Sequence, residues 1–256
     1  MTITRKYNGE EPMRVNKWLG QSGVCSRREA ESLIEQGLIS IDGETLTSPG
    51  HKIQPGQTLT LVAAGSIALS NKFTVVLNKP IGYVSSQPEG NQIPAARLVH
   101  RKNQQGTEQL IPNSKTSLAP LGRLDMDSRG LLLLSEDGVL AKAVIGPDAN
   151  MEKEYLVKVR GNISSDVLDL LRFGLELDGR QLKRAKVTRE GAGILRFVLI
   201  EGRNRQIRRM CDLVDLQVLD LQRIRIGPLM LGNLPEGMWR LLNSNERAAV
   251  IGHKMD

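Results

Sequence analysis

Apolar residues recur at helical spacing near the start of the chain and gather in short runs further along. Val15, Trp18 and Leu19 stand at i, i+3 and i+4, which predicts one apolar face of a helix. Residues 26–29 read SRRE, the form of a capping box, in which the serine hydroxyl and the glutamate satisfy each other's backbone amides. A second helix is therefore predicted from this point, with its apolar face over residues 30–34.

Extended segments are predicted directly after these two helices. Residues 38–41 and 44–46 flank the pair Asp42-Gly43, and an Asp-Gly pair between extended segments is typical of a β-hairpin. A further strand is predicted over residues 58–62. Residues 13–62 therefore form one small module, preceded by an extension at 1–12.

A boundary is predicted over residues 63–70, where the side chains are small and weakly patterned. Residues 71–256 then alternate strands with short helices, which indicates an α+β domain with a mostly antiparallel sheet. A polar segment at 86–117 interrupts the pattern, and we expect it to be irregular. The strands are expected over 74–77, 131–134, 154–159, about 187, 195–200 and 218–226, and the helices over 139–145, 166–173 and 204–213.

Composition limits the class of protein and the kind of partner. The 256 residues are 40% hydrophobic and 25% charged, which is ordinary for a globular protein, and the formal net charge is +7. A basic chain favours an acidic partner such as nucleic acid, although a basic surface also serves solubility. Cys25 and Cys211 have no partner at metal or redox spacing, so we expect reduced thiols, no metal site and a cytoplasmic protein. No secretory signal and no membrane span are predicted.

The first module carries four cations away from its apolar positions. Arg14, Lys17, Arg27 and Arg28 avoid the faces that Val15 and its neighbours define. Such residues form either a solvated helix face or a surface that binds phosphates. The residues alone leave both interpretations open.

A short polar loop is predicted before the apolar run at 131–134. Residues 122–131 read GRLDMDSRGL, so two glycines bracket a loop with Asp125 and Asp127. Aspartate in such a position is often only a turn residue, but the same loop can hold a carboxylate at the edge of a rigid scaffold. Paired carboxylates also occur in glycosidases. We disfavour that class, because the two aspartates are only two positions apart and nothing indicates a general acid with a raised pKa.

The densest group of cations stands towards the end of the chain. On the helix predicted over 204–213, Arg205, Arg208 and Arg209 are at i, i+3 and i+4 and share one face. Three cations on one face repel each other unless anions neutralise them, and RNA phosphates are natural candidates. The whole group consists of Arg203, Arg205, Arg208, Arg209, Arg223 and Arg225.

Five segments in order resemble the RsuA- and RluF-type family of ribosomal RNA pseudouridine synthases. Residues 13–62 resemble an S4 RNA-binding domain, and GRLDMDSRGL resembles the catalytic motif of the family. The segments NKPIG at 78–82, KEY at 153–155 and GRNRQIRRM at 202–210 match the opening, middle and closing motifs of the catalytic domain. The closing segment looks nearest to the RluF-like enzymes of the large ribosomal subunit.

The resemblance assigns roles to individual residues. It implies that Asp125 is the essential carboxylate, that Tyr155 stacks on the flipped uracil and that Arg208 pairs with Asp125. An arginine beside an aspartate lowers its pKa by roughly 1–3 units and keeps it ionised. The isomerisation conserves all atoms, so no cofactor is expected. The expected RNA-binding residues are Arg14, Lys17, Arg27, Arg28, Lys79, Arg123, Arg203, Arg205 and Arg209.

The resulting prediction is a cytoplasmic, monomeric enzyme that converts uridine to pseudouridine in 23S ribosomal RNA. Two alternatives stay open: an inactive RNA-binding or ribosome-assembly protein, and an enzyme of the same family that modifies the small subunit. The presence of Asp125, Tyr155 and Arg208 argues against an inactive relative. Against the small-subunit enzyme, the motif details argue only weakly.

Overall fold

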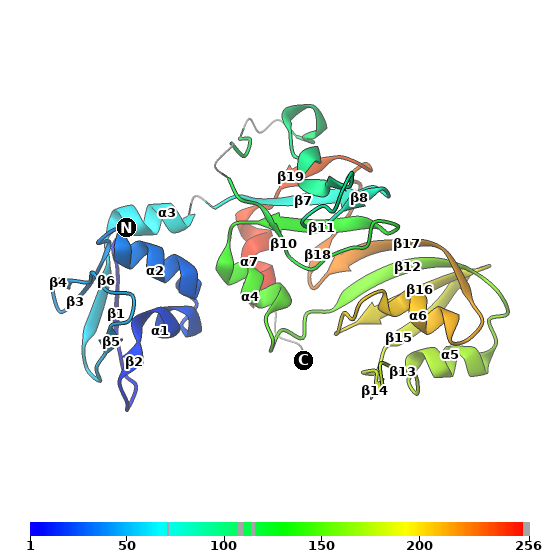
Figure 1. Ribbon diagram of the computed structural model, residues 1–256, viewed down its shortest axis with the longest axis horizontal. Coiled ribbons are helices and arrows are strands. Elements are labelled where there is room, and N and C mark those ends of the chain that lie inside the picture. The colour runs from blue at the N-terminus through cyan, green and yellow to red at the C-terminus, as the bar shows by residue number, and fades with distance from the viewer. Residues whose placement is uncertain (71, 107–109, 114–115, 253–256) are drawn as a thin grey trace. The chain divides into compact units, whose positions relative to one another are not determined.

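The computed structural model describes residues 1–70, 72–106, 110–113 and 116–252. The chain divides into two compact units, which Figure 1 shows with their elements labelled. The first unit contains residues 1–73 together with 135–142, and the second contains 74–134 together with 143–256. Each unit is described below by itself.

The first unit is a small sheet covered by helices. Its sheet has the strand order β1-β6-β3-β4, with antiparallel pairing of β1 to β6 and of β6 to β3. The elements are β1 (Ile3–Lys6), β2 (Met13–Arg14), α1 (Val15–Gln21), α2 (Arg27–Glu35), β3 (Ile39–Ile41), β4 (Glu44–Thr45), β5 (Lys52–Ile53), β6 (Thr58–Leu61) and α3 (Ala63–Ser70).

Local signals in this unit are confirmed. Ser26 accepts a hydrogen bond from the backbone amide of Glu29, and the glutamate side chain accepts one from the amide of Ser26, so the capping box is complete. Asp42 and Gly43 adopt φ angles of 48° and 90°, the left-handed conformation that a two-residue hairpin turn requires. The predicted helix starts and the hairpin turn therefore depend on interactions a few residues apart.

Two predictions at the borders of this unit are wrong. Residues 1–12 are not merely an extension, because Ile3 of β1 pairs with Leu61 of β6 and extends the sheet. Residues 63–70, predicted as a linker, form helix α3. A side chain at Gly65 would collide with Leu61 and Leu33, so this helix lies close to the core at its glycine. Its small residues allow that approach, and they also explain its weak pattern.

The second unit is built on one large mixed sheet. The described strands run in the order β15-β16-β12-β17-β11-β7-β19, with β10 beside β11 and β18 beside β17. Strands β11 and β17 are parallel, whereas β12 is antiparallel to both β16 and β17. The strands are β7 (Thr74–Lys79), β8 (Tyr83–Val84), β9 (Ile93–Pro94), β10 (Ala119–Pro120), β11 (Arg129–Ser135), β12 (Lys153–Arg160), β13 (Glu176–Leu177), β14 (Arg180–Gln181), β15 (Lys186–Gly191), β16 (Ile194–Leu199), β17 (Gln217–Ile226), β18 (Leu229–Met230) and β19 (Trp239–Leu241).

Helices pack against this sheet through apolar side chains. Val157, Phe197 and Leu199 of the sheet are buried with Ile207 and Met210 of α6 in one core. A second core lies around β7, β11 and β19. Tyr155 packs against both cores, which places it at their junction. The helices are α4 (Gly138–Ile145, which continues from the first unit), α5 (Ser165–Arg172), α6 (Gln206–Asp212) and α7 (Ser244–Gly252), and the short 3-10 helices are η1 (Ala95–Leu98) and η2 (Arg101–Asn103).

The fold class predicted from the sequence is confirmed. Each predicted strand and helix of the large domain is present within a few residues of its expected bounds. The described part of 86–117 contains only the short elements β9, η1 and η2 with connecting turns. Within the described ranges, no helix is both long enough and apolar enough to cross a membrane.

Candidate active site

The loop with Asp125 is fastened on both sides to the residues that flank β8. The hydroxyl of Ser85 donates to the carbonyl oxygen of Leu124 at 2.6 Å and accepts from its amide at 2.8 Å. The amide of Gly82 donates to the carbonyl of Met126 at 2.8 Å, and the amide of Ser128 donates to that of Asp125 at 3.1 Å. These bonds on either side of Asp125 fix the direction in which the carboxylate points.

A buried arginine on β17 holds the two ends of the same loop. Arg223 is 2% exposed. Its guanidinium donates to the carbonyls of Gly122 and Arg123 before the aspartate, and to that of Leu131 after it. A side chain at Gly130 would come within 2.3 Å of the Arg223 backbone, so only glycine lets the two strands approach this closely. The loop and β17 therefore form one rigid support for Asp125.

Asp125 lies in a pocket of about 160 Å³. Its side chain is 35% exposed, and the carboxylate is open to a ligand. Tyr155 of β12 forms part of the wall. The lining residues are Arg123, Leu124, Asp125, Ser128, Tyr155, Leu199, Glu201, Gly202, Arg203, Asn204, Arg205, Gln206, Ile207, Arg208 and Leu221.

The arginine that approaches Asp125 is Arg205, and the predicted pairing of Arg208 with Asp125 is wrong for this structure. Nη1 of Arg205 lies 3.9 Å from Oδ2 of Asp125. Nη2 of Arg208 donates to the carbonyl oxygen of Asp127 at 2.7 Å, and its Nε lies 3.3 Å from the carboxylate of Asp127. Arg208 is nevertheless part of the pocket wall, so the structure brings it together with Asp125 and Tyr155.

Asp127 is the carboxylate that both arginines neutralise. Arg205 donates to its two oxygens at 3.0 and 2.8 Å. The hydrogen bond from Arg205, assisted by the charge of Arg208, holds the pKa of Asp127 below its usual value. Arg205 precedes helix α6 in the left-handed conformation, with φ of 49°, so it does not share a helix face with Arg208 and Arg209 as the spacing predicted. The helical spacing of the three arginines could not indicate this left-handed conformation at Arg205.

Lys79 does not face RNA, contrary to the prediction. Its side chain is fully buried at the end of β7, and Nζ donates to the carbonyls of Pro80 and Tyr83. Burial lowers the pKa of Lys79 to about 8, although the charges of Asp125 and Asp127 partly oppose that shift. Lys79 therefore shapes the segment beneath the pocket and adds positive charge behind the two carboxylates.

The predicted basic group at the end of the chain separates into different environments. Arg203 donates to carbonyls of the β13–β14 hairpin, and Arg209 forms a two-point ion pair with Asp178 of that hairpin. Arg223 is internal, as described above. Of this group, Arg203, Arg205 and Arg208 line the pocket with Asp125, and Arg205 has the ion-pair contact with its carboxylate.

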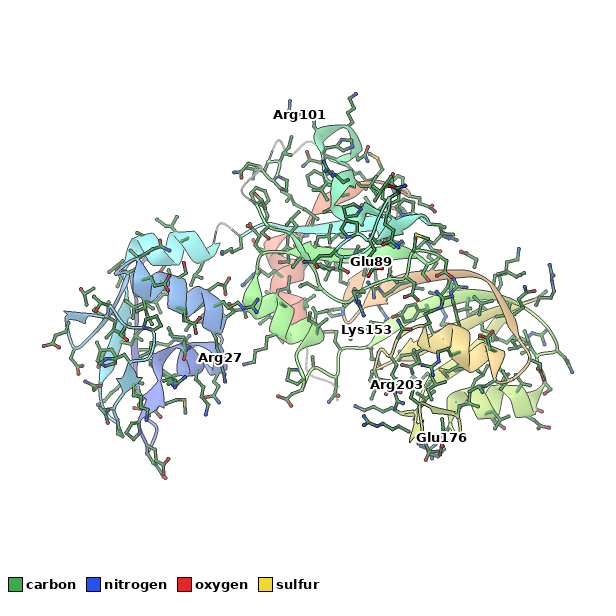
Figure 2. All side chains as sticks on the ribbon, in the orientation of Figure 1. Arg27, Glu89, Arg101, Lys153, Glu176 and Arg203 are labelled. Carbon is green, nitrogen blue, oxygen red and sulfur yellow. The ribbon has the colours of Figure 1, made fainter. Side chains whose placement is uncertain are left out.

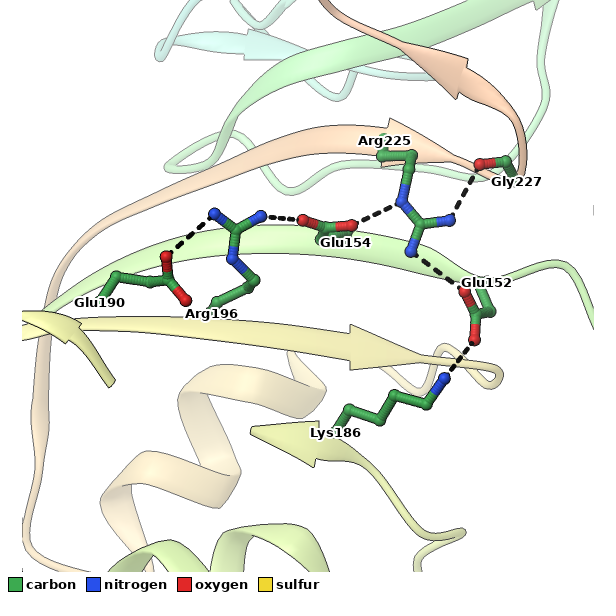
Figure 3. Close-up of polar contacts among 7 residues, drawn as sticks. All are labelled: Glu152, Glu154, Lys186, Glu190, Arg196, Arg225 and Gly227. Carbon is green, nitrogen blue, oxygen red and sulfur yellow. Dashed lines mark hydrogen bonds and ion pairs between the residues drawn. The ribbon is translucent and has the colours of Figure 1, made fainter. Parts of the chain in front are cut away.

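Arg225 belongs to a network of charges that ties four segments together (Figure 3). It contacts Glu152 and Glu154, and Arg196 of β16 contacts both Glu154 and Glu190. Lys186 of β15 completes the chain of ion pairs at Glu152. Protein carboxylates thus neutralise Arg225.

A bulge in β17 explains why Arg223 and Arg225 have different partners. Arg225 is opposite Glu154 and Arg223 is opposite Tyr155, so Ile224 between them is the extra residue. Such a bulge reverses the alternation of side chains along the strand. Arg223 consequently lies on the pocket side with Tyr155, and Arg225 lies with Glu154.

The first unit contains a groove whose charged lining consists of four cations and two acids, Glu10 and Glu11. Arg14, Lys17 and Arg27 line it, as the sequence grouped them, and Lys52 is a further cation that the sequence did not single out. Arg28 is exposed on α2 but is not part of this lining. Together these residues offer positive charge for an anionic ligand.

Sequence reasoning missed the residues that hold the loop. Ser85 lies just before the polar segment that was expected to be irregular, and nothing in its surroundings signals a contact with Leu124. Arg223 was noticed only as one member of a basic group. In the described part of the chain, no cluster of three or more histidine, cysteine or acidic side chains has the arrangement of a metal site.

Comparison with known proteins agrees with this geometry. The family of RNA pseudouridylate synthases matches residues 73–213, and the S4 domain family matches residues 13–59. The dual-specificity RNA pseudouridine synthase RluF of Escherichia coli K12 is 33% identical over 241 residues, covering 93% of this chain and 78% of that protein.

Two further matches cover nearly the whole chain. An uncharacterized RNA pseudouridine synthase of Aquifex aeolicus is 33% identical over 246 residues, covering 93% of this chain and 94% of that protein. A crystal structure of a pseudouridylate synthase has a TM-score of 0.63 at 23% identity, over 93% of this chain and 99% of that one, which supports the fold. The chain therefore belongs to the RNA pseudouridine synthase family and carries an S4 domain in its N-terminal part.

Proposed function

We propose that this protein isomerises uridine to pseudouridine in ribosomal RNA of the large subunit, with Asp125 as the essential carboxylate. The observation that carries the proposal is the position of Asp125: an accessible carboxylate on a doubly fastened loop, inside a pocket that Tyr155 and Arg208 also line. The similarity to the RNA pseudouridine synthase RluF supports RNA as the substrate class.

The reaction breaks the C1′–N1 bond of uridine and forms a C1′–C5 bond, while C5 loses a proton and N1 gains one. An ionised Asp125 either attacks C1′, so that the bonding electrons leave with the uracil, or removes a proton from C2′. Both routes require the carboxylate form. The guanidinium of Arg205 lies 3.9 Å from that carboxylate.

Tyr155 is proposed to hold the base after it leaves the RNA stack. Extracting a nucleotide costs a few kcal/mol. Stacking on an aromatic ring returns roughly 1–3 kcal/mol per base. Tyr155 is held between the two cores of the domain, so its ring provides a fixed surface in the pocket.

The partner of the basic groove in the first unit is proposed to be an RNA helix near the target. Arg14, Lys17, Arg27 and Arg28 are all exposed and suited to phosphates. We propose further that the protein acts as a monomer in the cytoplasm. The buried, reduced thiols of Cys25 and Cys211 support the location, and the molar mass in solution tests the monomer.

Asp125→Asn tests the central assignment. Asparagine has nearly the same shape but is neither a nucleophile nor a base, so we expect RNA affinity within about twofold of wild type and at least a thousandfold loss of pseudouridine formation. Ribosomal RNA from cells lacking the gene, complemented with either form, is mapped by carbodiimide labelling and primer extension. The matched control is Asp127→Asn, which removes a carboxylate two positions away.

The outcome separates the proposal from its alternatives. The assignment is supported if one primer-extension stop, which marks a labelled pseudouridine, is restored by the wild-type gene and not by Asp125→Asn. If that stop lies in small-subunit RNA, the substrate belongs to that subunit. Turnover by Asp125→Asn contradicts the role of Asp125. If no primer-extension stop depends on the gene, the result favours an RNA-binding protein without activity.

A further inference from the structure

A hairpin beside the pocket presents cations that the reaction scheme above does not use. Strands β13 and β14 are joined by Asp178 and Gly179, whose φ angles of 56° and 68° form a tight turn. Leu177 and Leu182 are buried in the core of the domain. The hairpin is therefore anchored at its base, while its polar side chains point outward.

Two arginines from the border of the pocket fasten this hairpin. The guanidinium of Arg203 donates to the carbonyls of Leu177, Arg180 and Gln181 at 2.8, 3.1 and 2.9 Å. Arg209 contacts Asp178 at the turn through both of its terminal nitrogens, at 3.0 and 2.6 Å. Figure 2 labels Arg203 and Glu176 on these neighbouring segments. Because Arg203 also lines the pocket, the hairpin is held at the pocket rim.

A second contact joins the hairpin to the pocket wall. The backbone amide of Lys183 donates to Oε1 of Glu201 at 2.9 Å, and Glu201 lines the pocket. The backbones of Arg180 and Lys183 are thus each one hydrogen bond away from a pocket-lining residue. Both residues are therefore tied through their backbones to the border of the pocket.

Arg180 and Lys183 differ from the other cations nearby. Both are exposed, and among the described residues neither side chain has a hydrogen-bond or ion-pair partner. Arg184, by contrast, lies over the ring of Phe173 at 4.2 Å. Asp178 pairs with Arg209 and Glu201 pairs with Arg203, whereas Glu176 of β13 is exposed and no described residue forms an ion pair with it. The hairpin and the residues that follow it therefore carry two unpaired cations, Arg180 and Lys183, against one unpaired carboxylate, Glu176.

We propose that the β13–β14 hairpin is an RNA contact in which Arg180 and Lys183 bind phosphates next to the target nucleotide. The inference rests on the proposed function and adds a contact surface to it. A base that enters the pocket draws its own phosphates to the rim. Cations fixed there hold the backbone in the flipped position, because phosphate contacts set position rather than sequence.

The test is the double charge reversal Arg180→Glu with Lys183→Glu. RNA affinity is measured in the Asp125→Asn background with a ribosomal RNA fragment that contains the target uridine, and KM and kcat are measured with active protein. We expect at least tenfold weaker binding and a matching rise in KM, with kcat at saturating RNA within about twofold. The slope of log affinity against log salt becomes shallower by about 1.4, which is two contacts at roughly 0.7 each for single-stranded RNA.

A matched control has the same change of charge elsewhere on the domain. Lys158 and Arg160 are exposed on β12 at positions that alternate with Tyr155, so Lys158→Glu with Arg160→Glu alters the opposite face of the sheet. This control should bind RNA within about twofold of the parent. The exchange Arg180→Lys with Lys183→Arg keeps both charges and should retain affinity.

Three results overturn the inference. They are unchanged affinity in the hairpin variant, an equal loss in the control, and a loss of kcat at saturating RNA without a change in affinity. The proposed function is judged separately, because it fails if wild-type protein forms no pseudouridine, whereas the hairpin is judged on binding by the inactive variant.

Discussion

Buried cations beneath the candidate site are the least ordinary residues of this chain. Lys79 and Arg223 are almost fully buried, and Lys153 is largely so. Their nitrogen atoms donate to backbone carbonyls: Lys153 Nζ contacts the carbonyl of Val144 at 3.3 Å. Buried charges are costly to maintain. The charge of Lys79 is close enough to Asp125 and Asp127 to interact with both carboxylates.

Lys153 gives this arrangement a measurable dependence on pH. Burial, assisted by the charge of Arg223, lowers the pKa of Lys153 to about 8 from 10.5. Between these two values the unfolded chain binds more protons than the folded one, so the lysine makes stability rise with pH in that window. We expect Lys153→Met to flatten the curve from pH 8 to 10.5 by at most about 1.4 kcal/mol per pH unit.

Urea unfolding at a series of pH values measures this difference. The pKa of Lys79 is also lowered, and this lysine is present in both proteins. The pKa values of the Cys25 and Cys211 thiols are raised, so they make stability fall with pH above 9, but they too are the same in both proteins. Lys158→Met, at an exposed position of the same strand, should follow wild type. Parallel curves for wild type and Lys153→Met would show that Lys153 stays protonated in the folded protein throughout this range.

Strand β17 connects the support of the Asp125 loop with the charge network on the other side of the sheet. Because of its bulge, Arg223 forms hydrogen bonds with the loop, whereas Arg225 forms ion pairs with Glu152 and Glu154. The position of Asp125 depends on the hydrogen bonds that Ser85 and Arg223 form with its loop. We therefore expect the geometry of Asp125 to be sensitive to changes in an element distant in sequence.

The substitution Arg223→Lys separates loop support from general stability. Lysine keeps the charge but cannot reach the carbonyls of Gly122, Arg123 and Leu131 together, so we expect a loss of about 2 kcal/mol in unfolding free energy. We also expect kcat to fall about tenfold with KM little changed. The control Arg225→Lys perturbs the same strand and should cost stability while kcat stays within about twofold. Equal effects on kcat in both variants would mean that Arg223 acts only through strand stability.

The same element shows where sequence reasoning ends. The capping box at Ser26 and the turn at Asp42-Gly43 could be predicted, because each is decided within four residues. Asp125 was found through its motif. The bulge at Ile224 and the contact of Ser85 with the loop could not be predicted, because pairing partners tens of residues away decide them. The pairing of Arg208 was mispredicted because the left-handed backbone at Arg205 brings a different arginine to Asp125.

At the scale of the whole molecule, each of the two units has a surface with basic residues that could contact RNA. The groove of the first unit and the pocket of the second are both suited to an anionic polymer. When two modules on one chain bind the same RNA, the second contact forms at high effective concentration, so their affinities reinforce each other. Loss of charge in the groove should then weaken binding without altering the chemistry at Asp125.

The double substitution Arg14→Ala with Arg27→Ala tests this division. Both residues line the groove and neither belongs to the pocket. Each lost phosphate contact reduces the salt slope by roughly 0.7–0.9, so the pair should flatten the plot of log affinity against log salt by about 1.6 while kcat at saturating RNA is retained. Titration of the ribosomal RNA fragment from 50 to 200 mM salt measures the slope, with Lys158→Ala and Arg160→Ala as the matched control. If the groove variant and the control keep the wild-type slope, the first unit does not bind phosphates through these residues, and the basic composition of its helices serves solubility alone.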